Sequence, residues 1–468
     1  MPMGVGKLKN LQVLSSFYVD KGCEANIQQL GELNLHGALY ISKVQNIINP
    51  ADALAANLKN KVHLLKLELE WNANSDDSEK ERKVLEKLQP SNHLKELSIR
   101  SYGGTRFPDW FGDNSLFNVV SLKLSNCENC VLLPPLGILP SLKELRIIGL
   151  SGIVVIGSDF YGNKSKSFSA IIPFESLQTI IFENMKRWEE WDCKILKVAW
   201  KDHYLNGLGT PYHTPLLNHC CDSLKTLQLD FFPKLQSLKL RNCSNLEMIS
   251  HELEHNHSLT RLTVTECPKF LSFPKGGFSA PCLKYFDLCK LENLKSLPEF
   301  MHILFPSLTD LTITNCPQLQ SFYNGGLPSS LKRMRLIGCS KFLIASLKWA
   351  LGINSSLKSL YIENVDVESF PDQGLLPLSL TSLYIYGFPI LKKLNYKGIC
   401  HLSSLEEVHL ADCPSLQCLP VEGLPKSIST LEIRHCRSLK QRCKKPEGED
   451  WGKISHIQSV MIDGDIIT

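Results

Sequence analysis

Long hydrophobic runs are missing from this sequence of 468 residues. No stretch reaches the roughly 18 consecutive apolar residues that mark a membrane-spanning helix. The N-terminal residues 1–14 also lack the charged region, apolar core and cleavage site of a secretory signal. We therefore expect no membrane partner, and a cytoplasmic setting with a nuclear one as the alternative.

A strong excess of one charge is missing as well. The 51 Lys and Arg residues stand against 47 Asp and Glu residues, which leaves a formal net charge of +4. Proteins that bind DNA or RNA neutralise phosphates with a basic stripe or patch, and this composition gives no sign of one. We therefore expect no nucleic-acid partner.

What the sequence does contain is one repeated phrase. The pattern L-x-x-L-x-L-x-x-C recurs as KLQSLKLRNC (234–243), SLTRLTVTEC (258–267), SLTDLTITNC (307–316), SLKRMRLIGC (330–339), SLEEVHLADC (404–413) and SISTLEIRHC (427–436). Its second apolar anchor returns every 23 to 26 residues, at Leu238, Leu262, Phe286, Leu311, Met334, Leu360, Leu383, Val408 and Leu431. This is the signature of a leucine-rich repeat.

The repeated motif is typical of a short β-strand with one apolar face. Leu311 and Ile313 point to one side, while Thr312 and Thr314 point to the other. Burying one Leu or Ile is worth roughly 1.5 to 3 kcal/mol, against about 1 to 2 kcal/mol to order each residue's backbone, so a repeat is stable only when it stacks on its neighbours. We predict an α/β repeat solenoid, a leucine-rich-repeat horseshoe with a parallel β-sheet on the concave face and mostly irregular or short helical convex segments.

The regularity of the repeats varies along the chain and predicts four regions. These are irregularly spaced N-terminal repeats with inserts (1–192), an irregular insert (193–222), regular C-terminal repeats (223–438) and a C-terminal cap or tail (439–468). Within the first region, Val84, Leu85 and Leu88 recur at helical spacing, which predicts a short convex helix within residues 72–90.

Two features depart from a regular array. The anchors Leu227 and Leu238 lie only 11 residues apart, so one of these two repeats is truncated or out of register. Repeat-like text also begins at residues 6–14 without an N-terminal cap, although terminal repeats normally need a polar outer face. We therefore expect a fragment of a longer protein or a truncated gene product.

Cysteine is plentiful, with 17 residues, and much of it belongs to the repeat. The last position of the phrase is occupied by Cys127, Cys243, Cys267, Cys316, Cys339, Cys413 and Cys436. A small buried thiol suits the turn at that point, so we expect reduced thiols and not disulfides.

Three short motifs are similar to known metal-binding or phosphate-binding motifs. Residues 251–255 (HELEH) fit the zinc motif H-E-x-x-H, with His257 as a conceivable third ligand, but the segment falls in a short return where a polar surface is the simpler interpretation. Residues 4–7 (GVGK) are similar to a phosphate loop, but they lack its upstream glycine and its following hydroxyl residue. The C-x-x-C of 127–130 has no second pair at zinc-site spacing. We expect no catalytic residue, no cofactor and no metal site.

The remaining candidate is the concave surface. Its central column, between the two strand anchors, comprises Lys123, Arg146, Ile181, Gln228, Lys239, Thr263, Asp287, Thr312, Arg335, Tyr361, Tyr384, His409 and Glu432. Arg and Tyr are enriched at binding hot spots, and they gather in the C-terminal half. We hypothesise a protein-binding patch of Arg333, Arg335, Tyr361, Tyr384, Tyr386 and His409. The alternative is that these side chains only solvate an exposed sheet.

Several phrases between the repeats are more specific than the repeats themselves. They are MPMGVGKLKNLQVLSSFYV (1–19), SYGGTRFPDWFGD (101–113), CVLLPPLGILPSLKELRIIGL (130–150), VVIGSDFYG (154–162), FENMKRWEEWDC (182–193) and LKQRCKKPEGEDWGKISHI (439–457). Through them nearly the whole chain resembles the leucine-rich-repeat region of plant disease-resistance proteins with a coiled-coil, nucleotide-binding, leucine-rich-repeat layout (NBS-LRR).

The resemblance implies a role in innate immunity. In that family a nucleotide-binding domain switches between a resting ADP state and an active ATP state, and the repeats hold the resting state closed and contribute recognition of pathogen effectors. The implied partners are the nucleotide-binding domain of the same or a related receptor, and a pathogen effector or a host protein modified by it. This sequence departs from the family layout because it contains no phosphate-binding loop, acidic metal-binding strand or coiled coil.

A non-enzymatic protein-binding region in plant defence is therefore the predicted function. The alternative is the substrate-recognition arm of a ubiquitin ligase, which would require an F-box helical segment near the N-terminus. Residues 1–60 contain only repeat-like sequence in its place.

Overall fold

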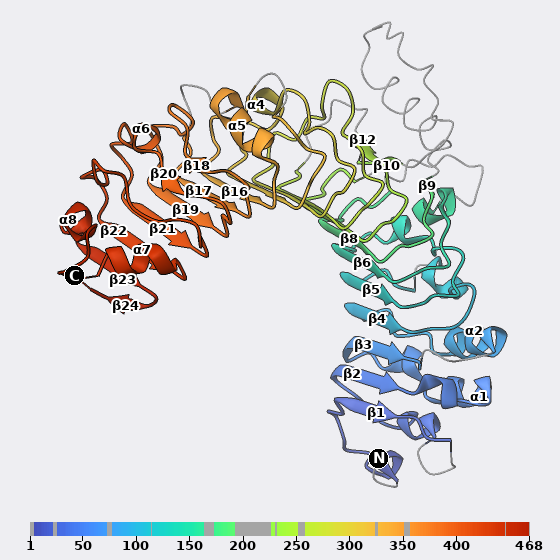
Figure 1. Cartoon of the computed structure of the whole chain (residues 1–468). Helices are drawn as coiled ribbons and strands as arrows, with labels where there is room; N and C mark the ends of the chain where they lie inside the picture. Colours follow the sequence, from blue (N-terminus) through green and yellow to red (C-terminus); the bar gives the residue numbers. More distant parts are fainter. Residues whose placement is uncertain are drawn as a thin grey trace, which may run out of the picture. The chain divides into compact units, whose positions relative to one another are not determined.

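The computed structural model describes residues 4–21, 26–72, 77–113, 115–162, 173–191, 226–229, 232–250, 258–322, 326–350, 356–444 and 446–467. The chain divides into two compact units, Met1–His255 and Asn256–Thr468. Within each unit a parallel sheet lies on one side, and the return segments with their short helices lie on the other (Figure 1).

The sheet of the first unit runs largely in chain order. Its strands are β1 (Ser16–Tyr18), β2 (Gly37–Ser42), β3 (Leu64–Glu70), β4 (Glu96–Arg100), β5 (Ser121–Ser125), β6 (Glu144–Ile148), β8 (Thr179–Glu183) and β11 (Ser237–Arg241), each parallel to the next. The helices are α1 (Pro50–Ala55) and α2 (Ser78–Lys87), with one-turn 3-10 helices η1 (Val5–Lys7), η3 (Ile27–Leu30), η4 (Val44–Asn46), η5 (Leu58–Asn60), η6 (Asp109–Phe111), η7 (Leu136–Ile138) and η8 (Ser158–Tyr161).

The second unit repeats this arrangement more regularly. Its parallel strands are β13 (Arg261–Thr265), β14 (Tyr285–Cys289), β15 (Asp310–Thr314), β16 (Arg333–Ile337), β17 (Ser359–Glu363), β19 (Ser382–Tyr386), β21 (Glu407–Ala411), β22 (Thr430–Arg434) and β23 (Ser459–Ile462), followed by the antiparallel β24 (Asp465–Ile466). The helices are α4 (Met301–Leu304), α5 (Lys341–Ala350), α6 (Tyr396–Ile399), α7 (Arg437–Arg442) and α8 (Trp451–Ile454).

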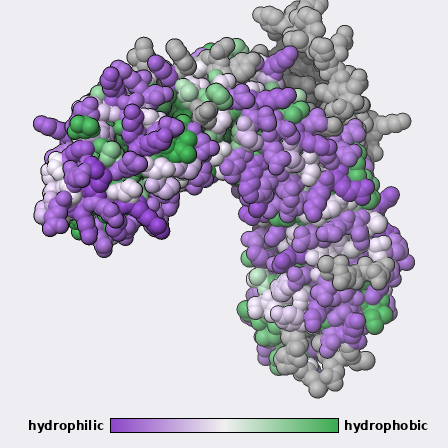
Figure 2. Space-filling model, in the orientation of Figure 1, coloured by the Kyte–Doolittle hydropathy of each residue, from purple (hydrophilic) through white to green (hydrophobic). Residues whose placement is uncertain are grey.

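Alternating burial along the strands confirms the predicted leucine-rich-repeat solenoid. In β15, Leu311 and Ile313 are 1% and 0% exposed, whereas Thr312 and Thr314 are half-buried on the other side. The register places each anchor on its counterpart in the next strand, as Leu311 lies on Met334. Most of the surface visible in Figure 2 is accordingly hydrophilic.

The crowded repeats at Leu227 and Leu238 are resolved by a change of partner. Strand β8 pairs directly with β11, so that Ile181 lies opposite Lys239. Strand β10 (Thr226–Gln228) pairs instead with β12 (Met248–Ser250) in a separate two-stranded sheet. The expectation that one repeat is out of register is confirmed, and the placement of Gln228 in the central column is wrong because its strand belongs to the second sheet.

Two further small sheets tie neighbouring return segments. They pair β7 (Val155–Ile156) with β9 (Glu190–Trp191), and β18 (Ser369–Phe370) with β20 (Lys393–Leu394). The helix predicted within residues 72–90 is confirmed as α2, whose N-terminus is capped by the Asp77 carboxylate accepting from the Lys80 backbone N–H at 2.9 Å. Val84 and Leu85 are buried on the face that packs inward.

The strands end at a residue with a left-handed backbone conformation, directly before the repeat cysteine. Asn315 and Gly338 occupy this position in adjacent repeats, with φ angles of 49° and 58°. Asn and Gly are the residues that adopt this conformation at least cost. A Cβ added to Gly338 would lie 2.0 Å from the Asn315 Oδ1 atom, so the amide fills the space that glycine leaves.

We predict that Gly338→Ala lowers the free energy of unfolding by about 2 kcal/mol, because left-handed strain and the clash with Asn315 act together. Gly276→Ala is a matched control, since Gly276 also has a positive φ of 83° but no neighbouring atom within 4 Å. It should lose only about 1 kcal/mol, the strain alone. Urea unfolding of the two variants measures the difference, and equal losses would show that the amide contact is irrelevant.

The repeat cysteines are buried free thiols, as the pattern predicts. Cys127, Cys243, Cys267, Cys316, Cys339, Cys413 and Cys436 all lie in the core. Burial raises the pKa of the Cys127 thiol to about 12 and that of Cys316 to about 11. These two thiols therefore stay protonated at neutral pH, and the Cys127 Sγ lies 3.5 Å from the Ser125 carbonyl oxygen as a weak donor.

Candidate protein-binding face

The candidate site lies on the outward side of the second unit's sheet. We call this the open face and define it as the first, third and fifth residues of the five-residue strands β13, β14, β15, β16, β17, β19, β21 and β22. The second and fourth residues of the same strands are buried anchors, so the strand period of two leaves the others facing away from the core. Neighbouring strands are about 4.8 Å apart, which lets one side chain from each strand touch the next.

A continuous stack of planar side chains occupies the central column of the open face. Arg335, Tyr361, Tyr384 and His409 are register partners on four successive strands. The Arg335 guanidinium lies 4.6 Å from the centre of the Tyr361 ring, and the Tyr361 and Tyr384 ring centres are 6.1 Å apart. The Tyr384 and His409 rings are stacked at 4.4 Å with an interplanar angle of 15°. The stack is thus assembled from residues one repeat apart in the sequence.

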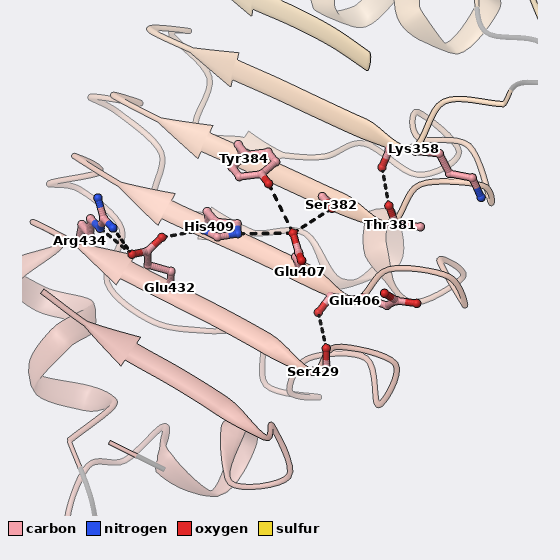
Figure 3. Close-up of polar contacts among 10 residues, drawn as sticks. All are labelled: Lys358, Thr381, Ser382, Tyr384, Glu406, Glu407, His409, Ser429, Glu432 and Arg434. Carbon is pink, nitrogen blue, oxygen red and sulfur yellow. Dashed lines mark hydrogen bonds and ion pairs between the residues drawn. The ribbon is translucent and has the colours of Figure 1, made fainter. Parts of the chain in front are cut away.

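Glu432 closes the stack at its C-terminal end. Its side chain is only 7% exposed, and its carboxylate oxygen Oε2 lies 2.7 Å from the His409 Nδ1 atom (Figure 3). The Arg434 Nε–H donates to Oε1 at 2.6 Å. Burial opposes ionisation of this carboxyl, but the hydrogen bonds from His409 and Arg434 outweigh it and lower the pKa of Glu432. A fixed negative charge therefore orients the imidazole at neutral pH.

A second carboxylate, Glu407, holds the tyrosine side of the stack. It accepts hydrogen bonds from the Ser382 hydroxyl at 3.0 Å and from the Tyr384 hydroxyl at 3.4 Å, and lies 3.9 Å from the His409 Nε2 atom (Figure 3). At the start of the strands, the Thr381 hydroxyl donates to the Lys358 carbonyl oxygen at 2.9 Å. The hydrogen bond to Glu407 restricts the rotamer of Tyr384 in the stack.

The tyrosine hydroxyls remain neutral donors. Tyr361 donates to the Glu363 carboxylate at 2.6 Å, and burial together with that hydrogen bond raises the pKa of Tyr361. Burial and the charge of Glu407 raise the pKa of Tyr384 in the same direction. Tyr386 stands nearly perpendicular to Tyr361, at 5.0 Å and 75°. The open face here presents aromatic rings with polar tips, a combination suited to protein contacts.

The structure brings together five of the six residues of the hypothesised patch. Arg335, Tyr361, Tyr384, Tyr386 and His409 contact one another through the rings described above. Arg333 stands apart from the stack. Its guanidinium pairs with the Asp310 carboxylate of the preceding strand, with the Arg333 Nη2 atom 2.9 Å from Oδ2.

Sequence reasoning left the carboxylates out of the patch. Glu363, Glu407 and Glu432 all touch the stack. A signal was available, because Glu363 and Glu407 lie two residues from Tyr361 and His409 on the same strands, and Glu432 is the register partner of His409. Their partners could not be assigned, since one carboxylate can reach either of two neighbouring strands. The binding role of the patch stays a prediction.

The zinc-like motif at 251–255, with His257, and the insert at 193–222 lie outside the described residues. Within the described ranges, no three His, Cys, Asp or Glu side chains are grouped so as to hold a metal ion. None of the helices in the same ranges has the length and hydrophobicity of a transmembrane segment.

Comparison with known proteins shows which repeat regions this chain is similar to. A family model described as R13L1/DRL21 LRRs matches residues 27–150. Disease resistance RPP13-like protein 1 of Arabidopsis thaliana is 34% identical over 279 residues, which cover 57% of this chain and 26% of that protein. Disease resistance protein RGA2 of Solanum bulbocastanum is 31% identical over 297 residues, which cover 63% and 27%. The chain therefore spans about a quarter of the length of these curated relatives.

Among solved structures, the leucine-rich-repeat protein LIC12759 of Leptospira interrogans aligns with 95% of this chain and 93% of its own, at 17% identity and a TM-score of 0.42.

Proposed function

Because this chain is similar to the leucine-rich-repeat region of plant NBS-LRR disease-resistance proteins, we propose that it is the protein-binding part of an intracellular immune receptor. It acts without catalysis, in effector recognition and in autoinhibition. Its partners are the nucleotide-binding domain of the same or a related receptor, and a pathogen effector or a host protein modified by it. The buried free thiols of the repeats suit the reducing cytosol.

One observation supports the proposal most directly, and it is the stack Arg335–Tyr361–Tyr384–His409. Its side chains are held by neighbours before any partner arrives, which reduces the entropy that binding must overcome. Arg and Tyr are also the types that dominate binding hot spots. A leucine-rich-repeat face with such a cluster is suited to binding protein.

The mechanism follows from linkage. A closed receptor keeps the open face against its nucleotide-binding domain, and a ligand that prefers the open receptor shifts the equilibrium only by its difference in affinity for the two states. The stack lies on the surface whose contacts differ between the closed and the open receptor. Weakening it should therefore alter autoinhibition, recognition or both.

We predict that Arg335→Ala and Tyr384→Ala each raise the Kd for a nucleotide-binding domain from a related receptor by about 30-fold, or roughly 2 kcal/mol. The reason is that each change removes one of the four planar side chains of the stack. Biolayer interferometry with the full chain measures the Kd. Lys123→Ala is the matched control, because Lys123 occupies the corresponding central column in the first unit and its loss should change the Kd less than twofold. Unchanged binding by both stack variants would rule out the patch as the contact for this domain.

A further inference from the structure

The arginines at outward-facing strand positions divide into two kinds. Taking the outward residues of both sheets, five arginines pair with carboxylates: Arg100 with Glu68 and Glu70, Arg146 with Glu144, Arg241 with Glu183, Arg333 with Asp310, and Arg434 with Glu432. Arg261 and Arg335 have no carboxylate partner among the residues that the structure describes. Both are exposed.

The two remaining arginines share another arrangement, because each lies over a tyrosine of the following strand. The Arg261 guanidinium carbon is 4.2 Å from the Tyr285 ring centre, and that of Arg335 is 4.6 Å from the Tyr361 ring centre. Stacking holds the guanidinium plane while leaving the N–H donors at its edge available. A carboxylate can then be met by two parallel hydrogen bonds without first ordering the side chain.

The surroundings of these arginines are basic. Over strands β13 to β17, the open face and the residue directly before each strand carry six cations against three carboxylates. The cations are Arg261, Lys284, Lys332, Arg333, Arg335 and Lys358, and the carboxylates are Asp287, Asp310 and Glu363. Asp310 is already paired with Arg333. The next three strands reverse this balance, with Glu406, Glu407 and Glu432 against Arg434.

We propose that the open face over β13 to β17 binds an acidic segment of a protein partner, with Arg261 and Arg335 each receiving one Asp or Glu carboxylate. This inference rests on the proposed protein-binding function and names the chemistry of the partner. The other five outward-facing arginines already bind carboxylates, so we expect Arg261 and Arg335 to bind carboxylates supplied by a partner. Arg261 and Arg335 lie three strands apart, about 14 Å, which an extended segment covers with acidic residues four positions apart at about 3.4 Å per residue.

The test uses the full chain and a fluorescent sixteen-residue Ser/Gly peptide with Glu at every fourth position, with binding followed by fluorescence anisotropy at low ionic strength. We expect the Glu peptide to bind at least ten-fold more tightly than its Gln counterpart. Arg335→Gln should weaken binding about ten-fold, and Tyr361→Leu several-fold, because the latter keeps the charge but removes the surface that orients it. Arg146→Gln removes the same charge from the first unit and should change binding less than twofold.

Each alternative outcome has a definite meaning. Equal binding of the Glu and Gln peptides, equal effects of Arg335→Gln and Arg146→Gln, or binding only of a phosphoserine version of the peptide would overturn the carboxylate proposal. If Arg335→Gln weakens capture of the nucleotide-binding domain but the Glu peptide does not bind, the protein-binding function stands and the acidic partner is wrong. If the Glu peptide binds through Arg335 while capture of that domain is unaffected, the carboxylate site stands and the partner assignment fails.

Discussion

Replacing Phe286 by alanine is expected to lower the free energy of unfolding of the second unit by about 4 kcal/mol. Phe286 fills the anchor position that leucine holds in most repeats, and it is 0% exposed. Its ring packs edge-on against Phe273 at 5.7 Å and against Phe305 at 5.8 Å, so truncation leaves a cavity between consecutive repeats. Because each repeat is stable only through its neighbours, the loss should be felt along the array. Urea unfolding followed by circular dichroism measures it.

Two companion variants make this prediction specific. Phe286→Leu restores the usual repeat anchor and should lose only about 1 kcal/mol, since most of the buried volume is kept. Phe300→Ala removes the same side chain type from a site that is 46% exposed and should stay within about 0.5 kcal/mol of the parent. A loss from Phe286→Ala no larger than that from Phe300→Ala would contradict the proposed packing.

The second large effect is expected at the C-terminal end of the array, where Asp450→Ala should lower stability by about 3 kcal/mol. The Asp450 side chain is 0% exposed and accepts the Leu419 backbone N–H at 2.9 Å, the Arg442 Nε–H at 3.1 Å and the Lys453 ammonium at 2.8 Å. It therefore ties α7 and α8 to the return segment of an earlier repeat. Its removal leaves a buried N–H without an acceptor and two cations without their shared partner.

The adjacent residue provides a matched control for Asp450. Glu449 also pairs with Arg442, but its side chain is 74% exposed, so Glu449→Ala should lose no more than about 1 kcal/mol. Thermal unfolding of both variants at pH 7 compares them. Equal losses would mean that burial of the Asp450 carboxylate does not matter.

The same cluster predicts the direction of the acid dependence. Burial opposes ionisation of Asp450, but hydrogen bonds from Arg442 and Lys453 outweigh it and lower the pKa of its carboxyl below the value of about 4 in an unfolded chain. Between those two pKa values the unfolded state binds more protons, so stability rises with pH. The contribution of Asp450 is thus present above about pH 4 and lost as the pH falls through its lowered pKa. Asp450→Ala should remove that part of the acid-induced loss.

The stack on the open face was within reach of the sequence because every part of it is periodic. Arg335, Tyr361, Tyr384 and His409 occupy the same position in successive repeats, and a parallel register aligns equal positions. What each side chain does beyond that alignment was not predictable. Arg333 and Arg335 lie on one strand, yet one pairs with Asp310 and the other lies on Tyr361, because each contact depends on the neighbouring strand.

The sequence by itself determined the repeat, the strand positions and the buried anchors, since these depend on a local pattern of period two that recurs every 23 to 26 residues. It also determined the reduced cysteines, because they stand at a fixed position of the same repeat. Only the tertiary structure decided which strands pair. Strand β11 joins β8, with Arg241 bonded to Glu183 at a separation of 58 residues, while β10 leaves the main sheet for β12. A short apolar strand has the same sequence pattern in the main sheet and in the two-stranded sheet, because backbone N–H and C=O groups carry no information about the partner strand. The choice rests on which neighbouring edge the folded chain brings to it.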